Sequence, residues 1–208
     1  VNLLVLSPFM YYILENYLIS KSEISFNLLK YFLILIIHSF GYYFAHLAMH
    51  KINYFKQFHK FHHSAETLTP LTVTRTHPFE GMIFILRSAI TQGVSIAIFV
   101  FLFGQQITLI TVLGVNISVI FFHSLGSNLR HSHIAIRYPI FIEKYLMSPA
   151  QHQLHHSSKK EHFDKNFGVA LSIWDRLNGS FMHSEIDQFE FGIGRETGEY
   201  TKSLANMY

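Results

Sequence analysis

Histidine is concentrated in short segments of the chain, and the same spacings recur between them. One segment holds an HxxxH pattern followed by an HxxHH pattern, and a second HxxHH pattern lies far downstream. These eight residues are His46, His50, His59, His62, His63, His152, His155 and His156. Residues three or four positions apart share one face of an α-helix, so each pattern can bring its imidazoles together. Because imidazole is the commonest metal-binding side chain and suits zinc, copper, iron and nickel, the patterns predict a metal site.

A further pair, His131 and His133, lies between these segments, so the candidate ligands number ten. The full set is His46, His50, His59, His62, His63, His131, His133, His152, His155 and His156. A tetrahedral zinc ion binds at most four ligands, so ten imidazoles predict two adjacent metal ions. The nearest acids in the sequence are Glu66 and Glu80. On one helix His131 and His133 would point about 200° apart. Both can bind metal only if this stretch is irregular; otherwise one of them supports the ligands from behind.

The remaining histidines have simpler interpretations. His38 stands alone on an apolar stretch and is predicted to be a core residue, whereas His162 and His183 lie among charged residues and are predicted at the surface. His77 precedes a proline, and it is interpreted as a ligand, a support for the ligands or a cap for the helix that follows. His123 ends an apolar stretch and is interpreted either as a ligand or as an interfacial anchor.

Composition points toward lipid. Half of the 208 residues are hydrophobic, 16% are aromatic and 14% are charged, against roughly 25% charged in soluble domains. The formal charge is only +3 and no basic run is present, which argues against nucleic acid as a partner. The absence of cysteine excludes disulfides and thiolate metal sites. We expect a single membrane domain over 1–208, with the motifs within about 30–182 and a cytoplasmic tail over 183–208.

Apolar stretches predict an all-α membrane bundle with about four transmembrane helices. They cover residues 1–19, 31–49, 82–103 and 107–122. The last two form a hairpin around the turn at 104–106, so the chain must leave and return on one face of the membrane. The histidine segments therefore meet on that face, in a helical cap. Lysines and arginines in residues 51–80 place this face in the cytoplasm by the positive-inside rule.

The motifs resemble the histidine boxes of the fatty acid hydroxylase superfamily, and especially those of its sterol desaturase branch. The similar segments are HLAMH at 46–50, HKFHH at 59–63, RTHPFE at 75–80, NLRHSH at 128–133 and HQLHH at 152–156. Asn166-Phe167-Gly168 and Trp174-Asp175-Arg176-Leu177 are similar to the NYG and WDRLFGT signature that closes the domain. Phe167, Asn178 and Ser180 replace its usual Tyr, Phe and Thr. The third box is HSH, whereas some hydroxylases have HxxxH.

The resemblance implies a membrane protein with two iron ions that uses O2 to hydroxylate or desaturate a C–H bond of a lipid, such as a sterol or a fatty acyl chain. Zinc could replace iron during purification. No flavin, haem or nicotinamide motif is present. Electrons should therefore come from a separate reductase with a cytochrome b5-like or ferredoxin-like carrier. The alternative is a histidine-rich membrane protein that binds or transports metal. A transporter would place its ligands near the bilayer midplane, whereas these boxes lie at helix ends.

Overall fold

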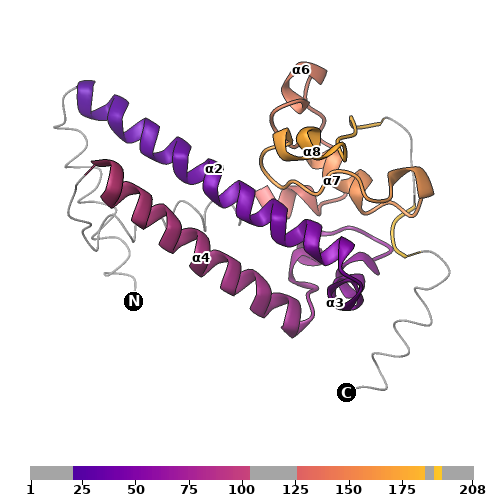
Figure 1. Cartoon of the computed structure of the whole chain (residues 1–208). Helices are drawn as coiled ribbons and strands as arrows, with labels where there is room; N and C mark the ends of the chain where they lie inside the picture. The colour runs from indigo at the N-terminus through magenta and orange to yellow at the C-terminus, as the bar shows by residue number, and fades with distance from the viewer. Residues whose placement is uncertain (1–20, 104–125, 186–189, 194–208) are drawn as a thin grey trace, which may run out of the picture.

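The computed structural model describes residues 21–103, 126–185 and 190–193 (Figure 1). Within these ranges the secondary structure is helical and contains no strand. Two isolated bridges, between Leu146 and Leu171 and between Ser157 and Phe191, are the extended pairings found there. The all-α prediction is confirmed for this part of the chain. The predicted spans at 1–19 and 107–122 lie outside the described residues, so the four-span arrangement and the cytoplasmic cap stay predictions.

Two long helices, α2 (Lys21–Lys51) and α4 (Pro78–Phe103), run side by side (Figure 1). Each contains a stretch long and apolar enough to cross a membrane, Phe32–Lys51 in α2 and Pro78–Ile98 in α4. The helices approach closely at Gly41, where a methyl group would overlap the side chain of Thr91. His38, one turn earlier, is buried as predicted, and its Nδ1 lies 3.3 Å from Thr91 Oγ1.

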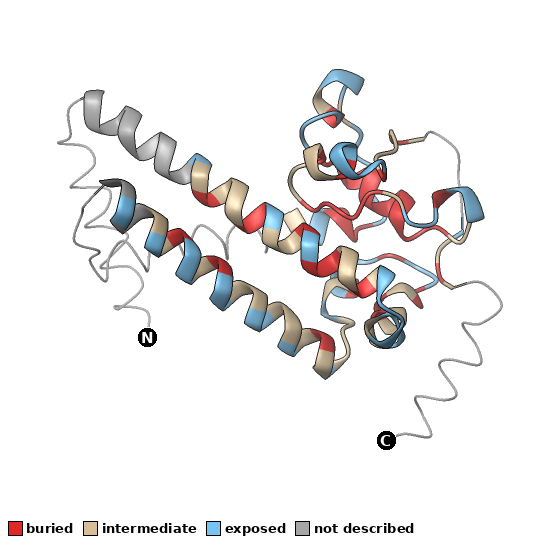
Figure 2. Cartoon of the chain, in the orientation of Figure 1, coloured by how far each residue is buried: buried red, intermediate tan, exposed pale blue. Residues whose placement is uncertain are grey.

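Large apolar side chains cover the outer faces of both long helices (Figure 2). They are Phe32, Phe40 and Phe44 on α2 and Met82, Ile85, Leu86, Ile90, Val94 and Phe101 on α4. A contiguous exposed apolar surface of this kind marks a contact with membrane or protein. Together with the apolar composition of the helices, it is typical of helices that face lipid.

Short helices pack around one end of α2 and form a cap. They are α3 (Asn53–His63), η1 (Pro70–Thr74), α6 (Ile140–Glu143), α7 (Pro149–His155), η2 (Lys160–His162) and α8 (Ile173–Asn178). Helix α7 begins at a capping box, in which Ser148 Oγ accepts the Gln151 N–H and Gln151 Oε1 accepts the Ser148 N–H. Proline at the first helical position favours the same start. All seven residues of α7 are buried, so its histidines lie in the centre of the cap (Figure 2).

The prediction that His162 lies at the surface is wrong. Its side chain is fully buried, and its Nε2 lies 3.3 Å from a carboxylate oxygen of Glu185. The charged neighbours that suggested exposure, Lys160 and Glu161, are indeed exposed. The tight turn of η2 directs its third residue inward, which the local charge pattern does not indicate. His183, also predicted at the surface, is half-buried.

Candidate metal centre

Nine of the ten predicted histidines come together in two clusters at the junction of α2, α3 and α7. The first cluster is His46, His50, His59, His63 and His155, and the second cluster is His62, His131, His152 and His156. Within each cluster one nitrogen of every ring lies within 4.8 Å of the corresponding nitrogens of the others. The clusters adjoin, because the rings of His63 and His156 stack with their centroids 4.4 Å apart. This arrangement fits two neighbouring metal ions.

Each HxxHH motif contributes two histidines to one cluster and one to the other, and the two motifs do so the opposite way round. In α3 the residues four apart join the first cluster, while His62 joins the second. In α7 and its C-cap, His152 and His156 join the second cluster, while His155 joins the first. Helix α2 adds the HxxxH pair to the first cluster, and His131 completes the second. Consecutive histidines therefore serve different metal positions, which explains why the motif ends in two adjacent imidazoles.

Hydrogen bonds fix the tautomers of the first cluster. His46 Nδ1 lies 2.7 Å from the carbonyl oxygen of Phe167, and His59 Nδ1 lies 2.8 Å from Glu80 Oε1. These oxygens accept, so each Nδ1 carries the proton and each Nε2 carries a lone pair. Yet the two Nε2 atoms are 3.1 Å apart. Two lone pairs at that distance repel each other unless a cation lies between them. Nitrogens bound at right angles to one ion, at about 2.1 Å each, would be about 3 Å apart.

The second cluster repeats this arrangement. His62 Nδ1 lies 3.2 Å from the carbonyl oxygen of Arg75, and His131 Nδ1 lies 2.8 Å from that of Ser127. Both Nε2 atoms therefore present lone pairs, and they are 3.1 Å apart. His152 Nε2 approaches His131 Nε2 to the same distance, 3.1 Å. Such contacts between acceptors are the arrangement expected around a bound cation.

Several buried ring nitrogens have no hydrogen-bond partner among the described residues. His155 Nδ1 donates to the carbonyl of Lys165 at 2.7 Å, which leaves its Nε2 unpartnered. His50 Nε2 and both ring nitrogens of His156 are also buried without a partner. Buried polar atoms in proteins are nearly always hydrogen-bonded or bound to an ion. These nitrogens fit a metal site and have no other evident role.

Burial keeps the imidazoles neutral and therefore able to bind metal. It lowers the pKa of His155 and His62 to about 4 and that of His131 to about 3. The pKa values of the other cap histidines in the clusters are also lowered by burial, and next by repulsion from neighbouring imidazoles. These are His59, His63, His152 and His156. At neutral pH each of these rings offers a lone pair, as metal ligation requires.

The loop of residues 165–168 provides two of the carbonyls that orient the first cluster. Asp175 holds this loop, because its two carboxylate oxygens accept the N–H groups of Phe167 and Gly168, each at 2.8 Å. A methyl group at Gly168 would collide with the carbonyl of Leu171 and with Asp175, so only glycine fits. The two signature motifs at the end of the domain thus position the histidines without contacting the metal positions.

Sequence reasoning missed two of these supporting residues. The sequence marks Glu80 as a nearby acid and as the end of the RTHPFE motif without giving it a role, whereas its fully buried carboxyl group accepts the His59 Nδ1–H group. A carboxylate behind a metal-binding imidazole fixes its tautomer and raises its basicity. Asp175 was noted only as part of a signature. The available signals were the acid that ends the RTHPFE motif at 75–80 and the acid within the Trp174-Asp175 motif.

The other candidate histidines lie elsewhere. His133 is exposed and belongs to neither cluster, although the helical turn over 126–130 ends before His131 and the chain then runs irregularly. His77 Nδ1 accepts the N–H of Phe79 at 3.1 Å, which supports its interpretation as a cap for α4. His123 lies outside the described residues.

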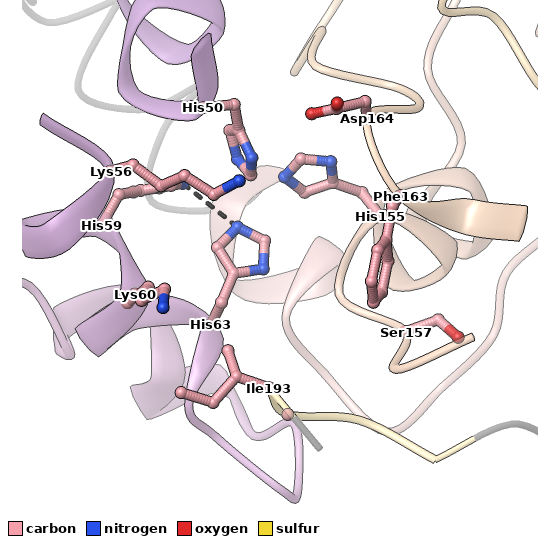
Figure 3. Close-up of a pocket in the computed structure, with 11 residues that line it drawn as sticks. His50, Lys56, His59, Lys60, His63, His155, Ser157, Phe163, Asp164 and Ile193 are labelled. Carbon is pink, nitrogen blue, oxygen red and sulfur yellow. Dashed lines mark hydrogen bonds between the residues drawn. The ribbon is translucent and has the colours of Figure 1, made fainter. Parts of the chain in front are cut away.

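A pocket of about 280 Å³ opens onto the first cluster. Figure 3 shows His50, His63 and His155 pointing toward one another from its walls. Lys56 and Lys60 line the mouth on the side of α3. Within the described part of the chain, no histidine of the second cluster lines this pocket. The first cluster is therefore accessible from outside, whereas the second is enclosed.

Comparison with known proteins agrees with the motifs. The family model described as "Fatty acid hydroxylase" matches residues 31–180. Lathosterol oxidase of Mus musculus is 28% identical over 162 residues, covering 78% of this chain and 46% of that protein. Alkylglycerol monooxygenase of Danio rerio is 28% identical over 163 residues, covering 77% of this chain and 32% of that protein. A Delta(7)-sterol 5(6)-desaturase of Gibberella zeae is 26% identical over 184 residues, covering 88% of this chain and 46% of that protein.

The chain spans less than half the length of these curated relatives. No solved structure matches it.

Proposed function

Because the chain belongs to the fatty acid hydroxylase family, as its motifs predicted, we propose that it is a membrane-bound di-iron oxygenase that acts on a lipid. The observation that carries this proposal is the convergence of nine histidines in two adjacent clusters whose lone pairs face one another. The relatives named above act as a sterol oxidase, an alkylglycerol monooxygenase and a sterol desaturase. They support a lipid substrate with a C–H bond that is hydroxylated or desaturated.

The donor set favours a redox metal in this context. Imidazole suits iron, copper and zinc, but zinc has no redox chemistry and could only replace the working metal. When bound, a pair of iron ions would activate O2 with electrons from an external carrier, of the cytochrome b5-like or ferredoxin-like kind. His46, His50, His59, His63 and His155 would hold one ion, and His62, His131, His152 and His156 the other.

The residues of the chain prepare this site in three ways. Backbone carbonyls and Glu80 hold the Nδ1 protons, so the Nε2 lone pairs are directed inward before metal arrives. All four rings of the second cluster are buried, which limits the access of water to that cluster. The pocket beside His50 and His155 gives the first cluster an opening. We propose that O2 and the reacting part of the lipid approach this cluster, and that the cap lies on the cytoplasmic face.

Metal transport is less well supported. A transporter exchanges its ion through loosely held ligands near the middle of the bilayer. Here the ligands gather at one end of α2, and Glu80 and several backbone carbonyls fix their rings in place.

The proposal can be tested by comparative lipid mass spectrometry of membranes with and without the protein, supplied with 18O2 and a reductant. A hydroxylase should add one labelled oxygen to a lipid, and a desaturase should give a product two hydrogens lighter without label. Both products should disappear under strict anaerobiosis. Product formed without O2 would show that the chain is not an oxygenase.

A further inference from the structure

A band of exposed apolar side chains extends from α2 across the outer edge of the cap. On α6, Ile140 and Phe141 are exposed, and so is Tyr145, two residues after the end of this helix. On α8, Leu177 has 77% of its surface exposed. Figure 2 shows α6 projecting from the buried part of the cap. Single exposed apolar residues are ordinary, but a contiguous group of them marks a surface that contacts something apolar.

Trp174 joins this band to the outer face of α2. Its ring meets Phe40 edge-on, with centroids 5.1 Å apart, and its Nε1–H donates to Ser39 Oγ at 3.0 Å. Phe40 in turn stacks on Phe44 at 6.4 Å. Phe40 and Phe44 are exposed and lie within the apolar stretch Phe32–Lys51 that could cross a membrane. Whatever medium surrounds Phe40 therefore also reaches α8.

Basic side chains border the band. Lys144 and Arg176 are exposed, and the Arg176 guanidinium lies over the Tyr145 ring, 5.6 Å from its centroid. Arg176 also donates to the carbonyl of Lys144 at 3.4 Å, which links the α6 and α8 segments. The acids next to them in the chain, Glu143 and Asp175, are both buried and hydrogen-bonded inside the cap, so neither opposes this positive charge at the surface. Apolar side chains, a tryptophan and bordering cations together are typical of segments that lie in a membrane interface.

We propose that the edge formed by α6 and α8 is embedded in the membrane interface. Ile140, Phe141 and Leu177 insert among the upper acyl chains, and Lys144 and Arg176 contact anionic lipid headgroups. Continuity with the lipid-facing side of α2 selects the bilayer as the occupant, in preference to a protein partner or a second copy. The inference goes beyond the proposed reaction and does not depend on it. It sets the height of the metal centre, because His46 and His50 follow Phe40 by about 9 and 15 Å along the helix.

The native protein allows a direct test, because Trp174 is its single tryptophan. The chain is placed in nanodiscs containing lipids brominated near the headgroup or deep in the acyl chain, and tryptophan fluorescence is measured. Shallow bromines should quench the emission by about half, and deep bromines should quench it less, as expected for an interfacial ring. Equal emission in brominated and unbrominated nanodiscs would overturn the proposal.

Single cysteines extend the test to the edge formed by α6 and α8, because the chain has no cysteine of its own. A fluorescent label on Phe141→Cys or Leu177→Cys should be quenched by brominated lipid and shielded from aqueous acrylamide. Phe101→Cys on the outer face of α4 is the lipid-exposed control, and Glu161→Cys on η2 is the water-exposed control. Labels at 141 and 177 that respond to acrylamide like position 161 would refute membrane contact. Shielding from both quenchers would also refute it, since a protein would then cover the band.

Discussion

The two histidine clusters differ in their access to the outside. The first cluster has five rings, of which His50 and His63 are half-buried and line the pocket. The second cluster has four rings, all buried, and is enclosed by its neighbours. In both clusters backbone carbonyls accept hydrogen bonds from Nδ1–H groups, which directs the Nε2 atoms of those rings inward. The two clusters therefore offer the same kind of ligand atom.

This difference suggests a division of labour between the clusters. If the proposed reaction takes place here, we expect the reactants to approach the first cluster, because the pocket ends on its rings. An ion held by the second cluster would be retained longer, because all four of its rings are buried.

Loss of one ligand should have the largest effect. His155→Ala should release metal from the first cluster, and His152→Ala should release it from the second. Either change should lower lipid oxidation by at least about 100-fold, because the removed imidazole cannot be replaced by its supporting groups. Elemental analysis should find close to one iron per chain in each variant. His133→Ala, which alters an exposed histidine outside both clusters, is the matched control and should keep both ions. Full activity in His155→Ala would contradict the site.

Removing charge behind a ligand should weaken one cluster alone. Burial raises the pKa of Glu80 to about 8, so the comparison is made at about pH 9, where the carboxylate carries its charge. Glu80→Gln keeps an acceptor for the His59 Nδ1–H group but removes that negative charge. Metal affinity of the first cluster should fall by about 10-fold, with the second unchanged. Titration of metal-free protein against a competing chelator measures both affinities. Glu66→Gln is the control, because Glu66 is exposed. An equal loss of affinity at both clusters would show that they do not act separately.

The rate of metal release should be higher for the first cluster, which the pocket makes accessible, than for the second. Zinc-loaded protein mixed with excess chelator should lose its metal in two phases of equal amplitude, with the faster one from the first cluster. Glu80→Gln should accelerate only the faster phase. Release of all zinc in a single phase would mean that the pocket confers no difference between the clusters.

Acidification should destabilise the metal-free protein. Burial lowers the pKa of His62 and His155 to about 4 and that of His131 to about 3, from an ordinary 6.5. Between about pH 6.5 and 4 the unfolded chain therefore binds more protons than the folded one, so stability falls as pH falls through this range. Each such histidine contributes on the order of 1 kcal/mol between pH 7 and 5.5. Thermal unfolding in detergent at the two pH values measures the change, and an unchanged melting temperature would contradict it.

The sequence was sufficient to predict which histidines assemble, because helical spacing fixes which imidazoles share a face. Hydropathy also predicted two of the apolar helices, and the two metal ions predicted from the number of ligands stay a prediction that the two clusters support. It did not predict that His62 and His63 would serve different clusters. That division depends on how α3 lies against α7, which is set by packing between segments far apart in the chain.

The supporting residues could not be placed from the sequence for the same reason. Asp175 acts on the loop of residues 165–168 through two backbone N–H groups, and local sequence carries no signal for that contact. His133 lies outside both clusters, in keeping with the alternative that only one of His131 and His133 is a ligand, and His162 was misplaced for a local reason. The chain bends irregularly after the helical turn over 126–130, and η2 turns one residue of a charged stretch inward.

If each cluster binds one iron ion, the metal content of the intact protein should show it. The full chain should be produced in iron-replete cells, purified in chelator-free detergent and analysed for iron and zinc against the chain concentration. We predict close to two metal ions per folded chain, with iron predominant. One ion or none in folded, monodisperse protein would contradict the two-cluster account.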